Sequence, residues 1–197
     1  RRSGVPAQDT LGREGRGSLT TPNGLVWAGF RPSDDACELG YNIPGNHFLA
    51  LALGRLAELL EQVADAPAEA DEARERAEQI RAALVEHGTI DGPTGERVWA
   101  YEIDGRGDHR FLDDANVPSL LSLPYLGCVA QDDPLYLATR AAVLSRSNPY
   151  YYEGLYLEGV GSPHTPKDHV WPIALAVEGL TSAERGEKLR LLELMIR

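Results

Sequence analysis

The pattern of apolar and polar positions predicts two consecutive long helices in the first half of the chain. Residues 46–63 are apolar on most faces and carry leucines at helical spacing, so we expect a buried helix there. Residues 68–86 carry charged side chains on most faces, and Gly88 follows them, which predicts an outer helix that ends in a left-handed cap. The narrow apolar stripe of this outer helix consists of Ala73, Ala77, Ile80 and Leu84.

Capping signals predict three shorter helices in the second half of the chain. Asp133 is followed by proline, which suits the first position of a helix, and Trp171 is followed by proline in the same way. Thr181 and Glu184 have the spacing of a capping box, so a last helix is expected to begin there.

The segments between the helices are rich in glycine, proline, aspartate and aromatic residues. Residues 97–112 hold an Asp-Gly-Arg-Gly turn between apolar residues, which is typical of a short hairpin. Residues 1–24 contain few large apolar groups and are expected to form a solvated arm that becomes ordered only against a partner surface. Buried helices that alternate with amphipathic ones predict an all-α fold in two layers, with the chemistry in the loops at one end.

Composition and charge narrow the class of partner. The 197 residues are 43% hydrophobic and 25% charged, which is typical of a globular domain. Thirty acidic and nineteen basic side chains give a formal net charge of −11. This charge repels phosphate backbones and anionic lipid surfaces, so we expect neither nucleic acid nor a membrane as a partner. A neutral ligand such as a sugar fits better.

The cysteines and the chain ends say little about location. Cys37 and Cys128 are too few for a disulfide framework and lack the spacing of a zinc site. Two free thiols favour a reducing compartment such as the cytoplasm, without deciding the location. No apolar stretch approaches the ~20 residues of a membrane-spanning helix. The chain begins without methionine and ends inside a helical pattern, so we expect an internal fragment.

The loop GLVWAGFRPSDDACELGYNIPGN combines an aromatic wall, a cation and two adjacent carboxylates. These are supplied by Trp27, Arg31, Asp34 and Asp35. In one interpretation, Ser33 and the two aspartates cap the next helix, with Arg31 as their ion-pair partner. In the other, this group belongs to a chemical site. The motif by itself supports the two interpretations equally.

A second acidic pair, Asp113 and Asp114, precedes an apolar stretch in FLDDANVPSLLSLPYLG, and Asn116 follows in the same loop. One aspartate is enough to cap the start of a helix, so capping is the stronger interpretation here. Carboxylates also accept paired hydrogen bonds from the adjacent hydroxyls of a sugar. The two roles can coexist.

The loop GVGSPHTPKDHVWP holds His164 between two prolines, with Ser162 and Thr165 beside it. A lone histidine is usually structural, but one held in so rigid a loop indicates a functional role. Trp171 and the tyrosines at 150–152 offer flat faces to a sugar, yet aromatic clusters also anchor loops, so we assign no stacking role to them.

Metal-dependent and nucleophilic mechanisms lack a supporting motif. The chain contains no H-E-x-x-H pattern and no G-x-S-x-G elbow, so we expect neither a metal nor another cofactor. The residues that could in principle gather around a metal ion are His109, Asp113, Asp114, His164, Asp168 and His169.

Four segments, taken in order, resemble glycoside hydrolase family 125. They are GLVWAGFRPSDDACELGYNIPGNHF, WAYEIDGRGDHRFLDDANVPSLLSLPYLG, NPYYYEGLYLEGVGSPHTP and VWPIALAVEGLTS. The resemblance extends from Gly24 to the C-terminus, although residues 62–94 match only in helical character. It implies an (α/α)6 toroid that removes terminal α-1,6-linked mannose with inversion and without metal, from a mannose-containing oligosaccharide.

The resemblance also implies residue roles. The general acid is Asp34 or Asp35, and the sequence does not choose between them. Inversion requires a second carboxylate that activates water, and the family's base glutamate belongs to a segment after the helix in which this chain stops. The glutamates after Trp171 are interpreted as helix-surface residues. The residues expected to bind substrate are Trp27, Arg31, Asp113, Asp114, Asn116, Ser162, His164 and Thr165.

Residues 1–197 are therefore expected to form a partial catalytic domain, an incomplete toroid with short β-hairpin loops that lacks N-terminal helices and the C-terminal end. Such a fragment should be inactive and marginally stable, because uncovered inner helices expose apolar area. The alternatives are a catalytically inactive carbohydrate-binding toroid, a helical interaction scaffold and a metal-dependent hydrolase.

Overall fold

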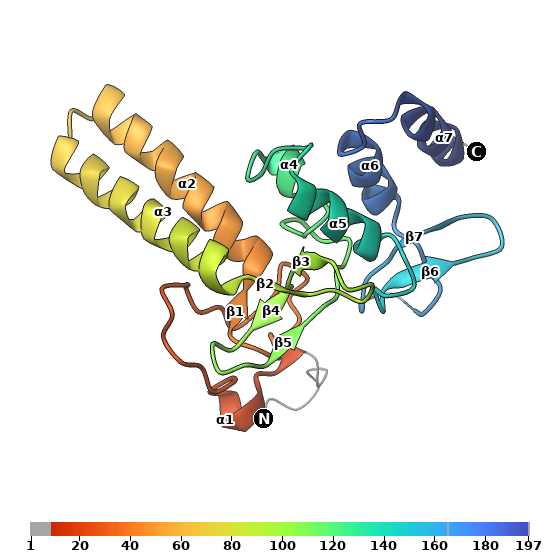
Figure 1. Cartoon of the computed structure of the whole chain (residues 1–197), viewed down its shortest axis with the longest axis horizontal. Coiled ribbons are helices and arrows are strands. Elements are labelled where there is room, and N and C mark those ends of the chain that lie inside the picture. The colour runs from red at the N-terminus through yellow and green to blue at the C-terminus, as the bar shows by residue number, and fades with distance from the viewer. Residues whose placement is uncertain (1–8, 165, 197) are drawn as a thin grey trace.

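The chain, described for residues 9–164 and 166–196 by a computed structural model, is rich in helix and carries short strands. In the view of Figure 1 the long helices lie above most of the strands and loops. The helices are α1 (Gly12–Gly15), α2 (Ile43–Gln62), α3 (Pro67–His87), α4 (Leu123–Leu126), α5 (Pro134–Val143), α6 (Pro172–Leu180) and α7 (Arg185–Ile196). None of the helices in these ranges is both long enough and apolar enough to cross a membrane.

The strands form three small antiparallel sheets, so the described chain is helix-rich and carries short strands, as the prediction of helices with short β-hairpin loops requires. β1 (Tyr41–Asn42), β4 (Glu102–Ile103) and β5 (His109–Arg110) make one sheet with β4 in the centre. β2 (Thr89–Asp91) pairs with β3 (Arg97–Trp99), and β6 (Tyr151–Glu153) pairs with β7 (Glu158–Val160).

The predicted hairpin is confirmed in its centre, where β4 and β5 pair across the glycine turn. The residues before it behave differently, because β3 pairs with β2 and not with β5. Strand β1 adds to the free edge of β4 and places Asn42 opposite Glu102. The sheet therefore joins the start of α2 to β4, which lies 60 positions later in the sequence. Through Glu102, β4 also contacts the RPSDD loop.

The α2–α3 hairpin projects from the rest of the molecule (Figure 1). The outer stripe predicted for α3 is confirmed, since its four apolar residues are buried. The buried character predicted for α2 is wrong along its far half, where Leu59 is 60% and Val63 78% exposed. Ala57 of α2 packs against Ala70 and Ala73 of α3, so small side chains fill this contact. Leu56 and Leu59 of α2 lie on the face that the described residues leave open.

The left-handed cap predicted at Gly88 is wrong, since the φ angle of this residue is −79°. Packing explains the glycine instead. A Cβ at this position would lie 2.7 Å from the carbonyl oxygen of Leu84 and 3.1 Å from the ring of Trp99. The glycine therefore lets the indole approach the end of α3.

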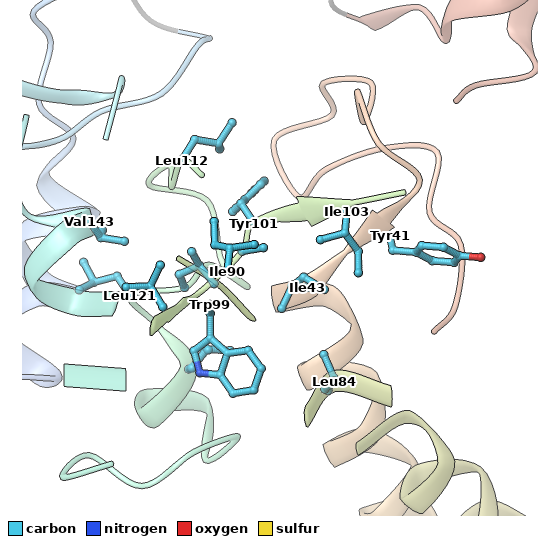
Figure 2. Packing of buried hydrophobic residues seen from close by; sticks show 14 of the residues in the cluster. Tyr41, Ile43, Leu84, Ile90, Trp99, Tyr101, Ile103, Leu112, Leu121 and Val143 are labelled. Atoms are coloured by element: carbon cyan, nitrogen blue, oxygen red, sulfur yellow. The ribbon is translucent and has the colours of Figure 1, made fainter. Parts of the chain in front are cut away.

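The core lies where the base of the α2–α3 hairpin meets the strands and α5. Figure 2 shows Ile43 and Leu84 on one side of this core and Leu121 and Val143 on the other, with Trp99 between them. The loops that carry the acidic motifs start from this well-packed centre, which restricts their positions.

The predicted helix starts in the second half are confirmed except for the last one. Asp133 caps α5 by accepting a hydrogen bond from the backbone N–H of Tyr136 at 2.9 Å. Thr181 does not open α7, because its hydroxyl donates back to the carbonyl oxygen of Val177 in α6. The hydroxyl of Ser182 accepts from the backbone N–H of Glu184 instead.

Candidate active site

The RPSDD segment forms a tight turn that separates its two aspartates. Phe30 and Ala36 form an antiparallel bridge at its base, and the N–H of Arg31 donates to the carbonyl oxygen of Asp35 at 2.8 Å. Asp34 lies exposed at the tip with a φ of +66°. The helix-capping interpretation of this motif is wrong, since α2 begins later and its capping residue is Asn42.

Asp35 folds back into the protein and is only 2% exposed. Its Oδ2 accepts a hydrogen bond from the hydroxyl of Ser33 at 2.6 Å. Its Oδ1 is buried and has no hydrogen-bond partner among the described residues. A buried carboxyl oxygen without a partner is costly unless a ligand supplies the missing hydrogen bond.

Asp35 and Arg31 line one cavity of about 470 Å³. Tyr150 and Pro163 contribute to its wall, and residues from Thr10 to Ser18 close another side. The N-terminal arm predicted to be solvated thus packs over the site in its described part. Asp34 is not among the lining residues.

Arg31 is 5% exposed and is held by a second buried charge. Its Nε lies 2.5 Å from Oε1 of Glu102, and its guanidinium carbon lies 5.6 Å from the ring centre of Tyr101. Burial alone would lower the pKa of Arg31, but the hydrogen bond to Glu102 and the charge of that carboxylate raise it above its ordinary value. Arg31 Nη2 is buried, has no hydrogen-bond partner in the described chain and lies 3.7 Å from Oε1 of Glu38.

The two members of the second acidic pair have different environments. Both oxygens of Asp113 accept hydrogen bonds from backbone N–H groups, from Leu120 at 2.9 Å and from Leu121 at 2.8 Å. Asp114 Oδ1 accepts from the backbone and the side chain of Asn116, while its Oδ2 is buried and has no partner among the described residues. Burial raises the pKa of Asp114, with Arg31 close enough to oppose the shift.

A chain of polar contacts connects this pair to Asp35. The side-chain amide of Asn116 donates to the hydroxyl of Ser162 at 3.3 Å, and the N–H of His164 donates to the same hydroxyl at 3.3 Å. His164 Nε2 lies 3.6 Å from Oδ2 of Asp35. Three loops that are far apart in sequence therefore meet at one carboxyl group. Thr165, the remaining residue predicted in this loop, lies outside the described residues.

Trp27 is not brought to the cavity wall. Its indole packs against Gly17, Gly29 and Gly40, where a Cβ would collide with the ring. The side chain therefore fastens the N-terminal segment to the loop that precedes β1.

Tyr101, Glu102 and Tyr150 belong to the site but were missed by the sequence reasoning. Tyr101 is fully buried, its hydroxyl has no hydrogen-bond partner in the described residues, and burial raises its pKa well above the ordinary value. The sequence carried one signal for Glu102, because it is an acidic residue within the apolar segment WAYEI. In a surface hairpin such a side chain would face solvent, whereas here its charge is buried.

The histidines and aspartates considered for a metal do not come together as one group. Within the described ranges, the donor atoms of Asp9, Asp35 and His164 lie within 4.8 Å of one another. Such a trio can coordinate a cation or surround a carboxyl group that exchanges a proton.

Comparison with known proteins assigns the chain to a family. The model of a family described as metal-independent alpha-mannosidase (GH125) matches residues 1–197. The chain belongs to glycoside hydrolase family 125.

Two relatives match nearly all of this chain. A Streptococcus pneumoniae structure, described as a metal-independent alpha mannosidase in a non-productive complex with alpha-1,6-mannobiose, is 39% identical with a TM-score of 0.94, covering 98% of this chain and 46% of that one. The meiotically up-regulated gene 157 protein of Schizosaccharomyces pombe is 45% identical over 192 residues, which are 95% of this chain and 37% of that protein. The chain thus spans less than half the length of either relative.

Proposed function

We propose that the protein to which this chain belongs removes non-reducing terminal α-1,6-linked mannose with inversion of configuration. The observation that carries the proposal is the Asp35 carboxyl, buried in a cavity beside Arg31 with one oxygen left unpaired. Family membership and the mannobiose complex of the Streptococcus relative support a mannoside as the substrate. The net charge of −11 suits a neutral oligosaccharide.

Asp35, and not Asp34, is the general acid in this proposal. An acid must reach the glycosidic oxygen inside a site that excludes water. Asp35 lines the cavity, whereas Asp34 faces solvent at the tip of the turn. Asp35 gives its proton to the leaving oxygen as the bond to the anomeric carbon breaks.

A second carboxylate, roughly 6.5–9.5 Å from the first, activates the attacking water in an inverting mechanism. We assign this base to a glutamate outside the chain. Among the candidates within it, Glu178 is 6% exposed and not on the helix surface as expected, but it bonds to Arg190 between α6 and α7. It is not among the residues that line the cavity of Asp35.

The unpaired atoms near Asp35 suit the hydroxyls of a hexose. Asp114 Oδ2 can accept a hydrogen bond and Arg31 Nη2 can donate one, so together they match a hydroxyl pair. His164 and Asn116 lie at the two ends of the same polar chain, His164 beside Asp35 and Asn116 beside Asp114. A bound sugar would supply the hydrogen bonds that Arg31 Nη2 and Asp114 Oδ2 lack within the described chain.

We further propose that residues 1–197 are part of a larger (α/α)6 toroid. The exposed leucines of α2, together with Leu189 and Leu192 of α7, form apolar faces that additional helices would cover. The separate chain is then marginally stable and inactive, because it lacks the proposed base.

The test uses the full-length parent protein with α-1,6-mannobiose and with aryl α-mannosides. Proton NMR should detect β-mannose as the first product, and turnover should survive a chelator. Asp35→Asn should abolish mannobiose cleavage but retain activity toward a dinitrophenyl mannoside, whose leaving group needs no proton. Asp34→Asn should leave both activities near wild type.

Several results would contradict the proposal. Release of α-mannose first would rule out inversion, and loss of turnover in chelator with rescue by a divalent ion would favour a metal-dependent hydrolase. Mannoside binding without any wild-type turnover would favour the inactive carbohydrate-binding toroid.

A further inference from the structure

Glu102 on β4 is a fully buried carboxylate that contacts both arms of the turn carrying Asp35. Its Oε1 lies 2.5 Å from Nε of Arg31, on the arm that enters the turn. Its Oε2 accepts hydrogen bonds from the backbone N–H groups of Glu38 and Leu39, both at 3.0 Å, on the arm that leaves it. One side chain therefore fixes the spacing of the two arms.

Glu102 is itself fixed by its place in the sheet. It lies in the central strand, opposite Asn42 on one side and Arg110 on the other. Arg110 also donates from Nε to Oε2 of Glu38 at 2.8 Å, which extends the ionic contacts toward the surface. A carboxylate on a doubly paired strand has little freedom to follow a moving loop.

The contact with Glu102 restricts the orientation of the Arg31 guanidinium. A guanidinium presents five donors in a planar fork, so a bond at Nε limits the directions of the others. Here Glu102 binds Nε, and the guanidinium carbon lies over the Tyr101 ring, 5.6 Å from its centre. Nη2 stays buried without a hydrogen-bond partner in the described residues, as does Oδ1 of Asp35.

We propose that Glu102 is a positioning residue for the mannosidase reaction, acting through Arg31 and the turn that carries Asp35. This inference rests on the proposed function. Glu102 touches no sugar and transfers no proton. It keeps Arg31 Nη2 and Asp35 Oδ1 oriented toward one substrate, so that an unbound site already has the geometry that the reaction needs.

The decisive variant is Glu102→Gln in the full-length parent protein. A glutamine oxygen can accept from the two backbone N–H groups, but its NH2 group then faces the Nε–H of Arg31, donor against donor. Arg31 should leave its present orientation, and we expect kcat on α-1,6-mannobiose to fall about 10- to 100-fold, as for other supporting groups of active sites. The matched control is Glu153→Gln, which removes an exposed glutamate paired with Arg146 and should leave kcat unchanged.

A chemical rescue separates positioning from a general structural role. Arg31→Ala leaves Glu102 facing an empty space, and free guanidinium ion should bind there and restore part of the lost kcat. The same ion should restore nothing in the double variant Arg31→Ala with Glu102→Gln, and tetramethylammonium should restore nothing in either. Thermal unfolding of each variant identifies protein that has failed to fold.

The outcomes are distinct. Wild-type kcat in folded Glu102→Gln, or equal guanidinium rescue with and without Glu102, would overturn the positioning role while the mannosidase proposal stands. A wild-type parent that releases no mannose would overturn both. If Glu102→Gln fails to fold, the single variant Arg31→Ala decides: rescue by guanidinium but not tetramethylammonium supports the inference, and no rescue rejects it.

Discussion

His164 Nε2 lies 3.6 Å from Oδ2 of Asp35, although the two residues come from loops at opposite ends of the described chain. The separation is longer than a hydrogen bond, and contacts of this kind often shorten when substrate binds. The contact places a ring nitrogen beside the proposed acid, on the side away from its unpaired oxygen.

We expect His164→Ala to lower kcat/KM on mannobiose by about 10- to 100-fold, because Asp35 would lose a neighbour that orients its carboxyl group. The control is His169→Ala in the same loop, whose exposed ring contacts only the backbone of Lys167 among the contacts described for it. Steady-state kinetics on both variants, together with their melting temperatures, tests the assignment. Equal kcat/KM values for the two variants would reject it.

Asp113 and Asp114 should separate into a structural and a substrate-binding residue. Asp113→Asn places an NH2 group against one of the two backbone N–H donors, so it should destabilise the protein by about 1–3 kcal/mol in urea unfolding. Asp114→Asn keeps the oxygen that Asn116 binds and changes only the unpaired one, so it should raise KM with little loss of stability. A stable Asp113→Asn variant with a raised KM, together with a destabilised Asp114→Asn variant, would contradict the geometry.

Glu178 should make stability depend on pH. Burial, followed by the nearby charge of Glu187, raises its pKa to about 7 from an ordinary 4.5, with Arg140 and Arg190 opposing the shift. The folded state then holds a proton that the unfolded state releases, so this contribution is fully present below about pH 4.5 and is lost as pH rises to about 7.

Glu178→Gln should remove this dependence, making the variant relatively more stable than wild type above pH 7 by roughly 1–3 kcal/mol. Urea unfolding at pH 5 and pH 8 measures the difference. A wild type and variant with parallel pH profiles would show that Glu178 does not hold the proton. Glu193→Gln, an exposed position on α7, serves as the control.

Gly88→Ala should destabilise the protein by about 1–3 kcal/mol, because the added methyl group would meet the Leu84 carbonyl oxygen and the Trp99 ring. Gly186→Ala is the matched control, since nothing lies within 4 Å of its added Cβ and alanine favours the helix. Thermal denaturation should move in opposite directions for the two variants. A neutral Gly88→Ala would show that Trp99 can shift.

The features that the sequence predicted well depend on local chemistry. The apolar stripe of α3 and the Asp133 cap follow from helical period and from side-chain acceptors within three residues. The exposure of Leu59 did not follow, because burial of a hydrophobic face depends on which elements lie against it. The left-handed cap predicted at Gly88 was wrong for the same reason. The residue that requires a glycine there is Trp99, which lies on β3 and not on α3.

The sequence indicated part of the candidate site but not its geometry. The motif RPSDD identified Arg31 and both aspartates, while the choice of Asp35 required the turn that exposes Asp34 at a positive φ. Glu102 was missed because a single glutamate in a strand gives no sign of a partner 71 positions earlier.

That separation in sequence affects how the protein is made. During synthesis the RPSDD turn leaves the ribosome long before β4 does, so a nascent chain ending ahead of residue 102 carries Asp35 and Arg31 without the carboxylate that supports them. Contacts between distant positions also form slowly, since the intervening loop must close first. The turn that carries Asp35 therefore cannot make its contacts with Glu102 until β4 has been synthesised.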